Sequence, residues 1–335
     1  MNFISIFDIH FLGRGHLFLA PLLFFLGLTG LPRPFSTEPP LAGLGGQAKI
    51  AVTTNLVLLP VIVTDARGTF VPGLKQQDFR VYENRQLQDL TAFEEGDTPV
   101  TVGLVVDHSR SMGAKLPEVV TAVSSFAHSS NPKDEMFVVD FNDDVSVELM
   151  KGKAFSNDAK ELGEALTAVS ARGRTALYDA VSEGLLHLHY GHLEKKALVI
   201  ISDGGDNASH LKYAQVLAQA RQSQALIYSI ALLGASGEEE NPRILQRLCR
   251  DTGGIAYFPG PRDTVASISE VIARDLRHQY TLGYVPQGIN GNNSFRKIEV
   301  KIAGPVHGRL HVRTRPGYST ADEKQPTAQL GSGTK

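Results

Sequence analysis

Four short apolar runs, separated by amphipathic stretches, dominate the middle of this sequence. The runs cover residues 100–107 (VTVGLVVD), 136–141, 197–202 and 225–230, and apolar residues recur at helical spacing between and after them. Short runs that are apolar at successive positions are typical of parallel strands buried on both faces. Val145, Val147 and Leu149 alternate with polar residues, which indicates an additional edge strand. We therefore predict an α/β fold, with a doubly wound and mostly parallel sheet, over residues 99–278.

The segments on either side of this region have β patterns instead. Residues 52–64 (VTTNLVLLPVIVT) are apolar and β-branched, which predicts a strand that is broken or bulged at Pro60. We expect residues 48–98 to pair with residues 279–319 in one small β domain, with the α/β domain inserted between them. Residues 320–335 are polar and predict a flexible tail.

The first 47 residues have the pattern of an export signal followed by a linker. Residues 17–31 (LFLAPLLFFLGLTGL) are shorter than the roughly 20 apolar residues of a membrane span, but they suit the core of a signal peptide. The alternative is an uncleaved N-terminal anchor, which would be the only contact with a membrane. Either interpretation predicts an extracytoplasmic protein, periplasmic or secreted.

Charge and cysteine content exclude several classes of function. Lys and Arg number 33 against 35 Asp and Glu, a net charge of −2, so we expect no nucleic-acid partner. A single cysteine, Cys249, excludes both a disulfide scaffold and a thiolate metal site.

Oxygen-bearing side chains follow three of the predicted buried strands. Asp107, Ser109 and Ser111 occupy alternate positions directly after the first strand, and we expect a helix to begin near Gly113. Thr175 precedes another predicted helix, and Asp203 follows the strand at 197–202. Ligands of open α/β sheets bind at the carboxyl ends of the strands, and an all-oxygen donor set suits a hard cation such as Mg²⁺ or Mn²⁺.

With these three elements in this order, residues 99–278 resemble a von Willebrand factor type A domain. The residues Asp107, Ser109, Ser111, Thr175 and Asp203 look like its metal-ion-dependent adhesion site. The resemblance implies Mg²⁺ (or Mn²⁺) on the two serines and the threonine, with the two aspartates bound directly or through water. It also implies a protein partner whose Asp or Glu carboxylate completes the coordination, so the function is adhesion or interaction. The flanking segments, such as GLKQQDFRVYENRQLQDLTAFEE and YTLGYVP, resemble the bacterial exported VWFA-related group.

Other interpretations of the same residues stay open. Asp107, Ser109 and Ser111 could form a helix N-cap, Thr175 could be another cap, and Asp203 a turn residue. Arg110 stands where many members of the family have glycine, so it could weaken cation binding or pair with an acidic partner. His108 is expected to point away from the hydroxyl groups. Asp206 could support the site through water, although capping or turn chemistry explains it as well.

Two alternative functions remain beside the interaction module. A metal-dependent hydrolase or phosphatase would need a nucleophile or base beside the ion, yet Ser109 stands where a D-x-D motif has its second aspartate. No G-x-S-x-G, H-E-x-x-H or P-loop motif is present. We therefore do not expect an enzyme. The third possibility is a structural domain without a metal-dependent partner.

Overall fold

The computed structural model describes residues 56–149, 153–167, 170–234, 240–287, 295–304 and 309–319. The predicted signal or anchor segment, its linker and the tail lie outside the described residues. Within those six ranges, no helix combines the length and the apolar character needed to cross a membrane.

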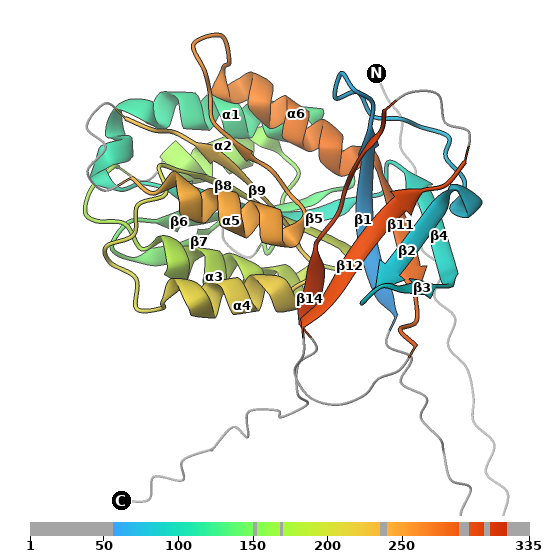
Figure 1. Ribbon diagram of the computed structural model, residues 1–335. Helices are drawn as coiled ribbons and strands as arrows, with labels where there is room; N and C mark the ends of the chain where they lie inside the picture. The colour runs from blue at the N-terminus through green and yellow to red at the C-terminus, as the bar shows by residue number, and fades with distance from the viewer. Residues whose placement is uncertain are drawn as a thin grey trace, which may run out of the picture. The chain divides into compact units, whose positions relative to one another are not determined.

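A six-stranded sheet with the order β10-β9-β8-β5-β6-β7 forms the centre of the α/β domain (Figure 1). Its first five strands pair in parallel and β7 runs antiparallel to β6, which confirms the predicted mostly parallel sheet with an edge strand. Every residue of β5 is buried, because helices cover both faces of the sheet. The strands are β5 (Val100–Asp107), β6 (Glu135–Phe141), β7 (Val145–Glu148), β8 (Lys195–Ser202), β9 (Leu226–Ala231) and β10 (Ala256–Tyr257).

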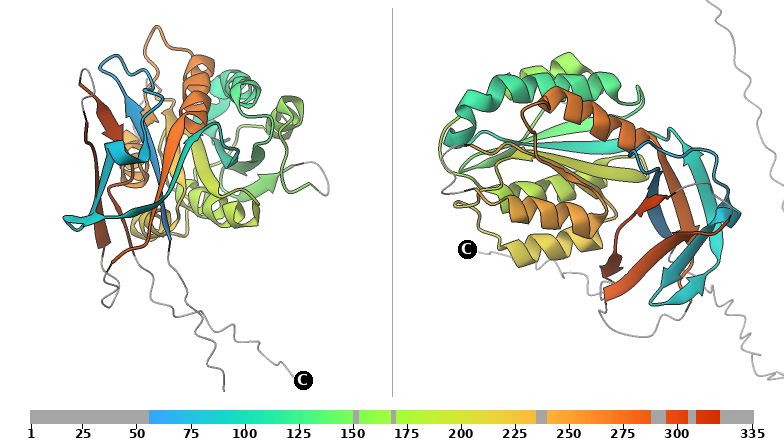
Figure 2. Two further views of the ribbon diagram at one scale, coloured as in Figure 1. Left: turned by 90° about the vertical axis from the view of Figure 1, so that its right-hand side faces the viewer. Right: turned by 45° about the horizontal axis from the view of Figure 1, so that its top comes forward.

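Three helices pack on each face of this sheet (Figures 1 and 2). Leu104 and Val106 of β5 point to one layer and Val105 to the other, as the two-residue period of a strand requires. One layer contains α1 (Leu116–Ser129), α2 (Ala159–Thr167) and α6 (Val265–Arg277); the other contains α3 (Leu177–His187), α4 (Tyr213–Gln222) and α5 (Pro242–Thr252). Helix α2 is an element that the sequence pattern did not predict.

The flanking segments form the β domain, and their strands divide between two four-stranded sheets. Pairing of β1 with β11 and of β2 with β12 joins the segment before the α/β domain to the segment after it. Apolar side chains from both sheets, among them Val61, Val81 and Leu282, share one core. One sheet contains β13 (His311–Arg313), β1 (Val57–Thr64), β11 (Gln279–Tyr284) and β4 (Leu90–Gly96); the other contains β14 (Gly317–Ser319), β12 (Phe295–Ile302), β2 (Phe79–Glu83) and β3 (Gln86–Gln88).

Strand β1 continues through Pro60, where the sequence predicted a break or bulge. Residues 57–61 pair with β11, whereas pairing with β13 begins only at Ile62. One side of the strand is therefore outside the ladder at Pro60, and a proline without an N–H group is tolerated there.

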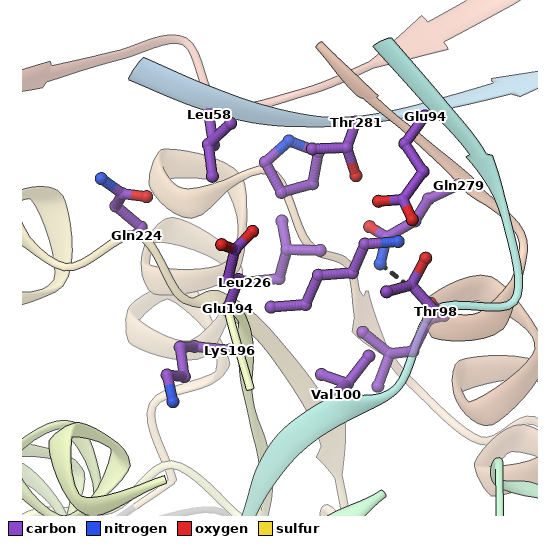
Figure 3. A pocket seen from close by; sticks show the side chains of 13 residues that line it. Leu58, Glu94, Thr98, Val100, Glu194, Lys196, Gln224, Leu226, Gln279 and Thr281 are labelled. Atoms are coloured by element: carbon purple, nitrogen blue, oxygen red, sulfur yellow. Dashed lines mark hydrogen bonds between the residues drawn. The ribbon is translucent and has the colours of Figure 1, made fainter. Parts of the chain in front are cut away.

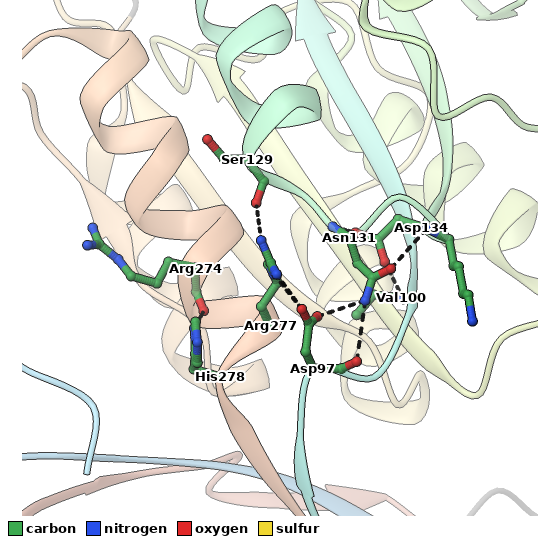
Figure 4. Close-up of polar contacts among 9 residues, drawn as sticks. Asp97, Val100, Ser129, Asn131, Asp134, Arg274, Arg277 and His278 are labelled. Carbon is green, nitrogen blue, oxygen red and sulfur yellow. Dashed lines mark hydrogen bonds and ion pairs between the residues drawn. The ribbon is translucent and has the colours of Figure 1, made fainter. Parts of the chain in front are cut away.

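Ion pairs and hydrogen bonds tie the two domains where the chain passes between them (Figure 4). Asp97, between β4 and β5, accepts a hydrogen bond of 2.8 Å from Nε of Arg277, at the end of α6, and one of 2.9 Å from Nδ2 of Asn131. Burial opposes ionisation of Asp97, but these two partners hold its pKa below the ordinary value. A second ion pair joins Arg313 of β13 to Asp275 of α6.

Candidate functional site

Asp107 is the last residue of β5 and fixes the loop that follows. Its side chain is fully buried; Oδ1 accepts a hydrogen bond of 2.8 Å from the Ser109 amide, and Oδ2 accepts one of 2.7 Å from Oγ of Ser202. Burial raises the pKa of Asp107 to about 6, and the neighbouring charge of Asp203 adds to this effect. The carboxylate is therefore held in place by two hydrogen-bond donors, and none of the described residues forms an ion pair with it.

Ser109, Ser111 and Asp203 form a continuous row of oxygen atoms. Oγ of Ser109 lies 3.1 Å from Oγ of Ser111, which donates a hydrogen bond of 2.7 Å to Oδ2 of Asp203. Ser109 and Asp203 are buried, whereas Ser111 is exposed. The loops after β5 and β8 thus meet side by side at the carboxyl edge of the sheet.

Thr175 comes from a third loop, immediately before α3. Its amide donates a hydrogen bond of 2.8 Å to Oδ1 of Asn207, and its carbonyl accepts one of 2.9 Å from the Asn207 amide. Gly173 has a φ of +74°, and a Cβ there would overlap the Asp143 carboxylate, so this turn requires glycine. Thr175 lines the same open pocket as Ser109 and Ser111, with a volume of about 500 Å³.

Two arginines line this pocket beside the hydroxyl groups. Arg174 is held by Asp143, with Nε 2.9 Å from Oδ1, and its Nη1 lies 3.4 Å from the Asn207 carbonyl oxygen. Arg110 is exposed and makes no ion pair with any residue in the described ranges. The mouth of the pocket therefore offers positive charge to a ligand.

His108 points away from the hydroxyl groups, as predicted, and is buried in a pair with Asp140. Its Nδ1 contacts Oδ1 of Asp140, and its Nε2 lies 3.2 Å from the Leu166 carbonyl. Burial opposes protonation of the ring, but Asp140 outweighs it and the pKa of His108 is raised. Both ring nitrogens are thus engaged below the site.

Asp206 has a capping role at the start of α3. Its Oδ1 accepts hydrogen bonds from the Tyr178 amide (3.1 Å) and from Oγ of Ser209 (2.5 Å), which caps the first turn of α3. The helix expected near Gly113 begins later: a 3₁₀ turn covers Arg110–Lys115, and α1 begins only at Leu116. The turn forms because the Met112 amide bonds back to the Ser109 carbonyl at 3.0 Å.

Two residues that the sequence analysis did not single out support the site. Ser202 bonds Asp107, and Asn207 positions Thr175. The position of Ser202, at the end of β8 and directly before Asp203, is a weak sequence indication that it belongs to the site. Nothing in the sequence marks Asn207 as the hydrogen-bond partner of Thr175, which lies 32 positions earlier.

The donor set has the chemistry of a hard-cation site. It combines three hydroxyl groups with the two buried carboxylates of Asp107 and Asp203, and neither carboxylate has an ion-pair partner in the described part of the chain. A divalent cation would compensate these charges, and oxygen ligands are those that Mg²⁺ and Mn²⁺ prefer. No group of three or more His, Cys, Asp or Glu side chains suited to a metal occurs among the described residues, so hydroxyl groups would supply much of any coordination here.

Comparisons with known proteins point to one family. The model of the von Willebrand factor type A domain matches residues 101–269, about half of the chain. The inter-alpha-trypsin inhibitor heavy chain H2 of Mesocricetus auratus is 26% identical over 228 residues, which cover 62% of this chain and 24% of that protein. The chain therefore matches about a quarter of the length of this relative.

The solved structures to which this chain is similar are distant in sequence. A von Willebrand factor type A protein from Catenulispora acidiphila superposes with a TM-score of 0.47 at 12% identity, covering 73% of this chain and 74% of that one. The manganese-loaded TRAP protein of Plasmodium vivax superposes with a TM-score of 0.42 at 14% identity, covering 67% and 96%.

Proposed function

Because the chain belongs to the von Willebrand factor type A domain family, we propose that it is an exported, metal-ion-dependent module that binds a protein partner. Domains of this family often mediate metal-dependent protein interactions. The proposal for this chain names a Mg²⁺ or Mn²⁺ site and a partner that presents an Asp or Glu carboxylate to it.

The observation that carries the proposal is the meeting of three loops from distant parts of the sequence. Ser109 and Ser111 line one pocket with Thr175, and Ser111 bonds directly to Asp203. A helix cap would explain each residue singly, but none of Asp107, Ser109 or Thr175 accepts a side-chain capping bond from a helix that follows it in the described structure. A shared ligand explains why Ser109, Ser111 and Thr175 line the same pocket.

Such a site would use two kinds of ligand from this chain, hydroxyl groups and carboxylates. Ser109, Ser111 and Thr175 would hold the cation, and Asp107 and Asp203 would bind it directly or through water. Where the two aspartates bind through water, the direct ligands are neutral hydroxyl groups, so the bound cation would still attract a further carboxylate from a partner. The small number of carboxylates favours Mg²⁺ or Mn²⁺ over a Ca²⁺ cage.

The arginines at the pocket mouth favour an acidic partner. Arg110 is exposed, and Arg174 is held in one orientation by Asp143. A guanidinium group binds a carboxylate through two parallel hydrogen bonds, so Arg110 would attract the acidic side chain that approaches the metal.

Binding suits the site better than hydrolysis does. A serine nucleophile needs a base within hydrogen-bond reach, and His108, beside Ser109 in the sequence, has its nitrogens directed at Asp140 and Leu166. The proposal of an exported location rests on residues 17–31 of the sequence.

Calorimetric titration of MgCl₂ and MnCl₂ into the protein tests the metal site. Thr175→Val keeps the side-chain volume and removes one proposed ligand, and Thr121→Val is the matched control on the exposed face of α1. We expect saturable binding in the parent and in the control, and none in Thr175→Val. Equal binding in all three proteins, or none in the parent, would contradict the proposed site.

A further inference from the structure

Three buried, unpartnered polar atoms line a small cavity of about 40 Å³ where the two domains meet (Figure 3). They are Nζ of Lys195, Oε1 of Gln279 and Oγ1 of Thr281, and none has a hydrogen-bond partner in the described part of the chain. Lys195 belongs to β8 of the α/β domain, whereas Gln279 and Thr281 belong to β11 of the β domain. Buried polar atoms of this kind are normally hydrogen-bonded to protein or to ordered water.

The ammonium group of Lys195 is enclosed, and no residue in the described ranges forms an ion pair with it. The residue is 8% exposed, and its burial lowers the pKa of the amine although Glu94, Asp97 and Asp134 oppose the shift. Asp97 already binds Arg277 and Asn131, and Asp134 accepts a hydrogen bond of 2.8 Å from the Val100 amide. These carboxylates attract the lysine at a distance but do not satisfy its donors.

The side chain of Gln279 presents a hydrogen-bond acceptor, its amide oxygen Oε1, to the cavity. Its Nε2 donates a hydrogen bond of 2.9 Å to the Leu276 carbonyl, which fixes the amide and leaves Oε1 unpaired. The residue is 1% exposed, so bulk solvent does not reach it. The cavity therefore presents a donor on one side and an acceptor on the other, with the Thr281 hydroxyl able to act as either.

Only one class of small ligand can form hydrogen bonds with the Lys195 ammonium, the Gln279 amide oxygen and the Thr281 hydroxyl group together. An anion would bind Lys195 but would be repelled by Oε1 of Gln279 and by Glu94 and Glu194, which also line the cavity. A cation would be repelled by Lys195. Water accepts from the ammonium and donates to the amide oxygen, and a volume of 40 Å³ holds about two or three molecules.

We propose that this cavity is a water-binding site, in which about two ordered water molecules connect Lys195 of the α/β domain to Gln279 and Thr281 of the β domain. The waters lie between the domains near the ion pair of Asp97 with Arg277, so this part of the junction is hydrated and polar. The inference does not depend on the metal site.

A crystal structure of the full chain, with matched variants, tests this site. We expect water density within hydrogen-bond distance of Nζ of Lys195 and Oε1 of Gln279. Lys195→Met, which keeps the length of the side chain, should lose the water bound to Nζ. Lys196→Met is the control, because Lys196 lines the same cavity but its Nζ already donates a hydrogen bond of 2.9 Å to the Gly191 carbonyl.

A bromide soak distinguishes water from an anion through anomalous scattering. A bromide peak in the cavity, or an empty cavity in the parent, would overturn the proposal. If Lys195→Met does not fold, Thr281→Val serves in its place, because it removes one hydroxyl with little change in volume. Unchanged water positions in Thr281→Val would then count against the site, and loss of the water nearest Oγ1 would support it.

Discussion

Oγ of Ser111 donates a hydrogen bond of 2.7 Å to Oδ2 of Asp203, a residue 92 positions further along the chain. This bond joins the loops after β5 and β8, which are neighbouring strands in the sheet. Both atoms are proposed cation ligands, so the bond brings two ligands together before any ion arrives. Such an arrangement lowers the conformational entropy that binding has to overcome.

Asp203→Asn tests the contribution of charge at this position. The amide has nearly the shape of the carboxylate but lacks its charge, so we expect Mg²⁺ affinity to fall at least about tenfold. In the parent, Mg²⁺ at about 100 times its Kd should raise the free energy of unfolding by about 2.7 kcal/mol. Urea denaturation with Mg²⁺ or with a chelator measures this, and an equal gain in Asp203→Asn would contradict the assignment.

Arg110→Gln separates metal binding from partner binding. Removal of a positive charge near the cation should strengthen Mg²⁺ binding a few-fold, since repulsion at a solvated pocket is of the order of 1 kcal/mol. The same change should weaken binding of an immobilised aspartate-rich peptide in Mg²⁺. Calorimetry and surface binding measure the two effects, with Arg67→Gln in the β domain as the control. Unchanged peptide binding in Arg110→Gln would remove this arginine from the partner surface.

The parts of the fold that depend on local periodicity could be predicted from the sequence. Short buried runs such as 100–107 predict parallel strands, because a sheet covered on both faces needs apolar side chains at successive positions. The division of the β domain into two sheets depends on which distant strands pair, for example Val81 with Val300, and local pattern carries no information on that choice.

The proposed metal ligands of the candidate site could also be predicted from the sequence, but the residues that position them could not. Asp107, Ser109 and Ser111 stand out because alternate oxygen atoms follow a buried strand. Asn207 holds Thr175 through contacts that only the folded loops create, and Asp206 caps α3 for the same reason. Helical spacing of apolar residues from Leu116 to Phe126 agrees with α1, whereas the 3₁₀ turn before it was not predicted, because it depends on the bond of the Met112 amide to the Ser109 carbonyl.

Asp140→Ala should destabilise the α/β domain strongly. It leaves His108 buried without its carboxylate partner, and breaking such a pair costs about 3 kcal/mol. Asp143→Ala is the matched control, because it removes an aspartate whose pair with Arg174 lies in solvent, and we expect a much smaller loss. Urea denaturation of both variants measures the difference. Similar midpoints for the two would show that the pair of His108 with Asp140 contributes little.

Lys195→Met should raise the stability of the protein in a manner that depends on pH. In the folded chain, burial lowers the pKa of Lys195 below 10.5, the ordinary value, which we take for the unfolded chain. At pH values between the lowered pKa and 10.5, the unfolded chain therefore binds more protons than the folded chain. The free energy of unfolding of the parent therefore rises with pH across this window. Methionine has no proton to lose, and the variant lacks this rise. At neutral pH the variant should be more stable by of the order of 1 kcal/mol, because an unpaired charge no longer has to be buried.

This advantage of Lys195→Met should shrink as the pH rises through 10.5, above which the lysine becomes neutral in both states of the parent. Urea denaturation at several alkaline pH values measures it as the difference between parent and variant, so that other titrating groups cancel. Lys133→Met replaces an exposed lysine and controls for the loss of one positive charge. The difference in free energy of unfolding between Lys195→Met and the parent could instead stay constant with pH, or equal the difference found for Lys133→Met. Either result would mean that the ammonium of Lys195 is as well solvated in the folded protein as in the unfolded chain. The ordered water would then compensate its burial completely.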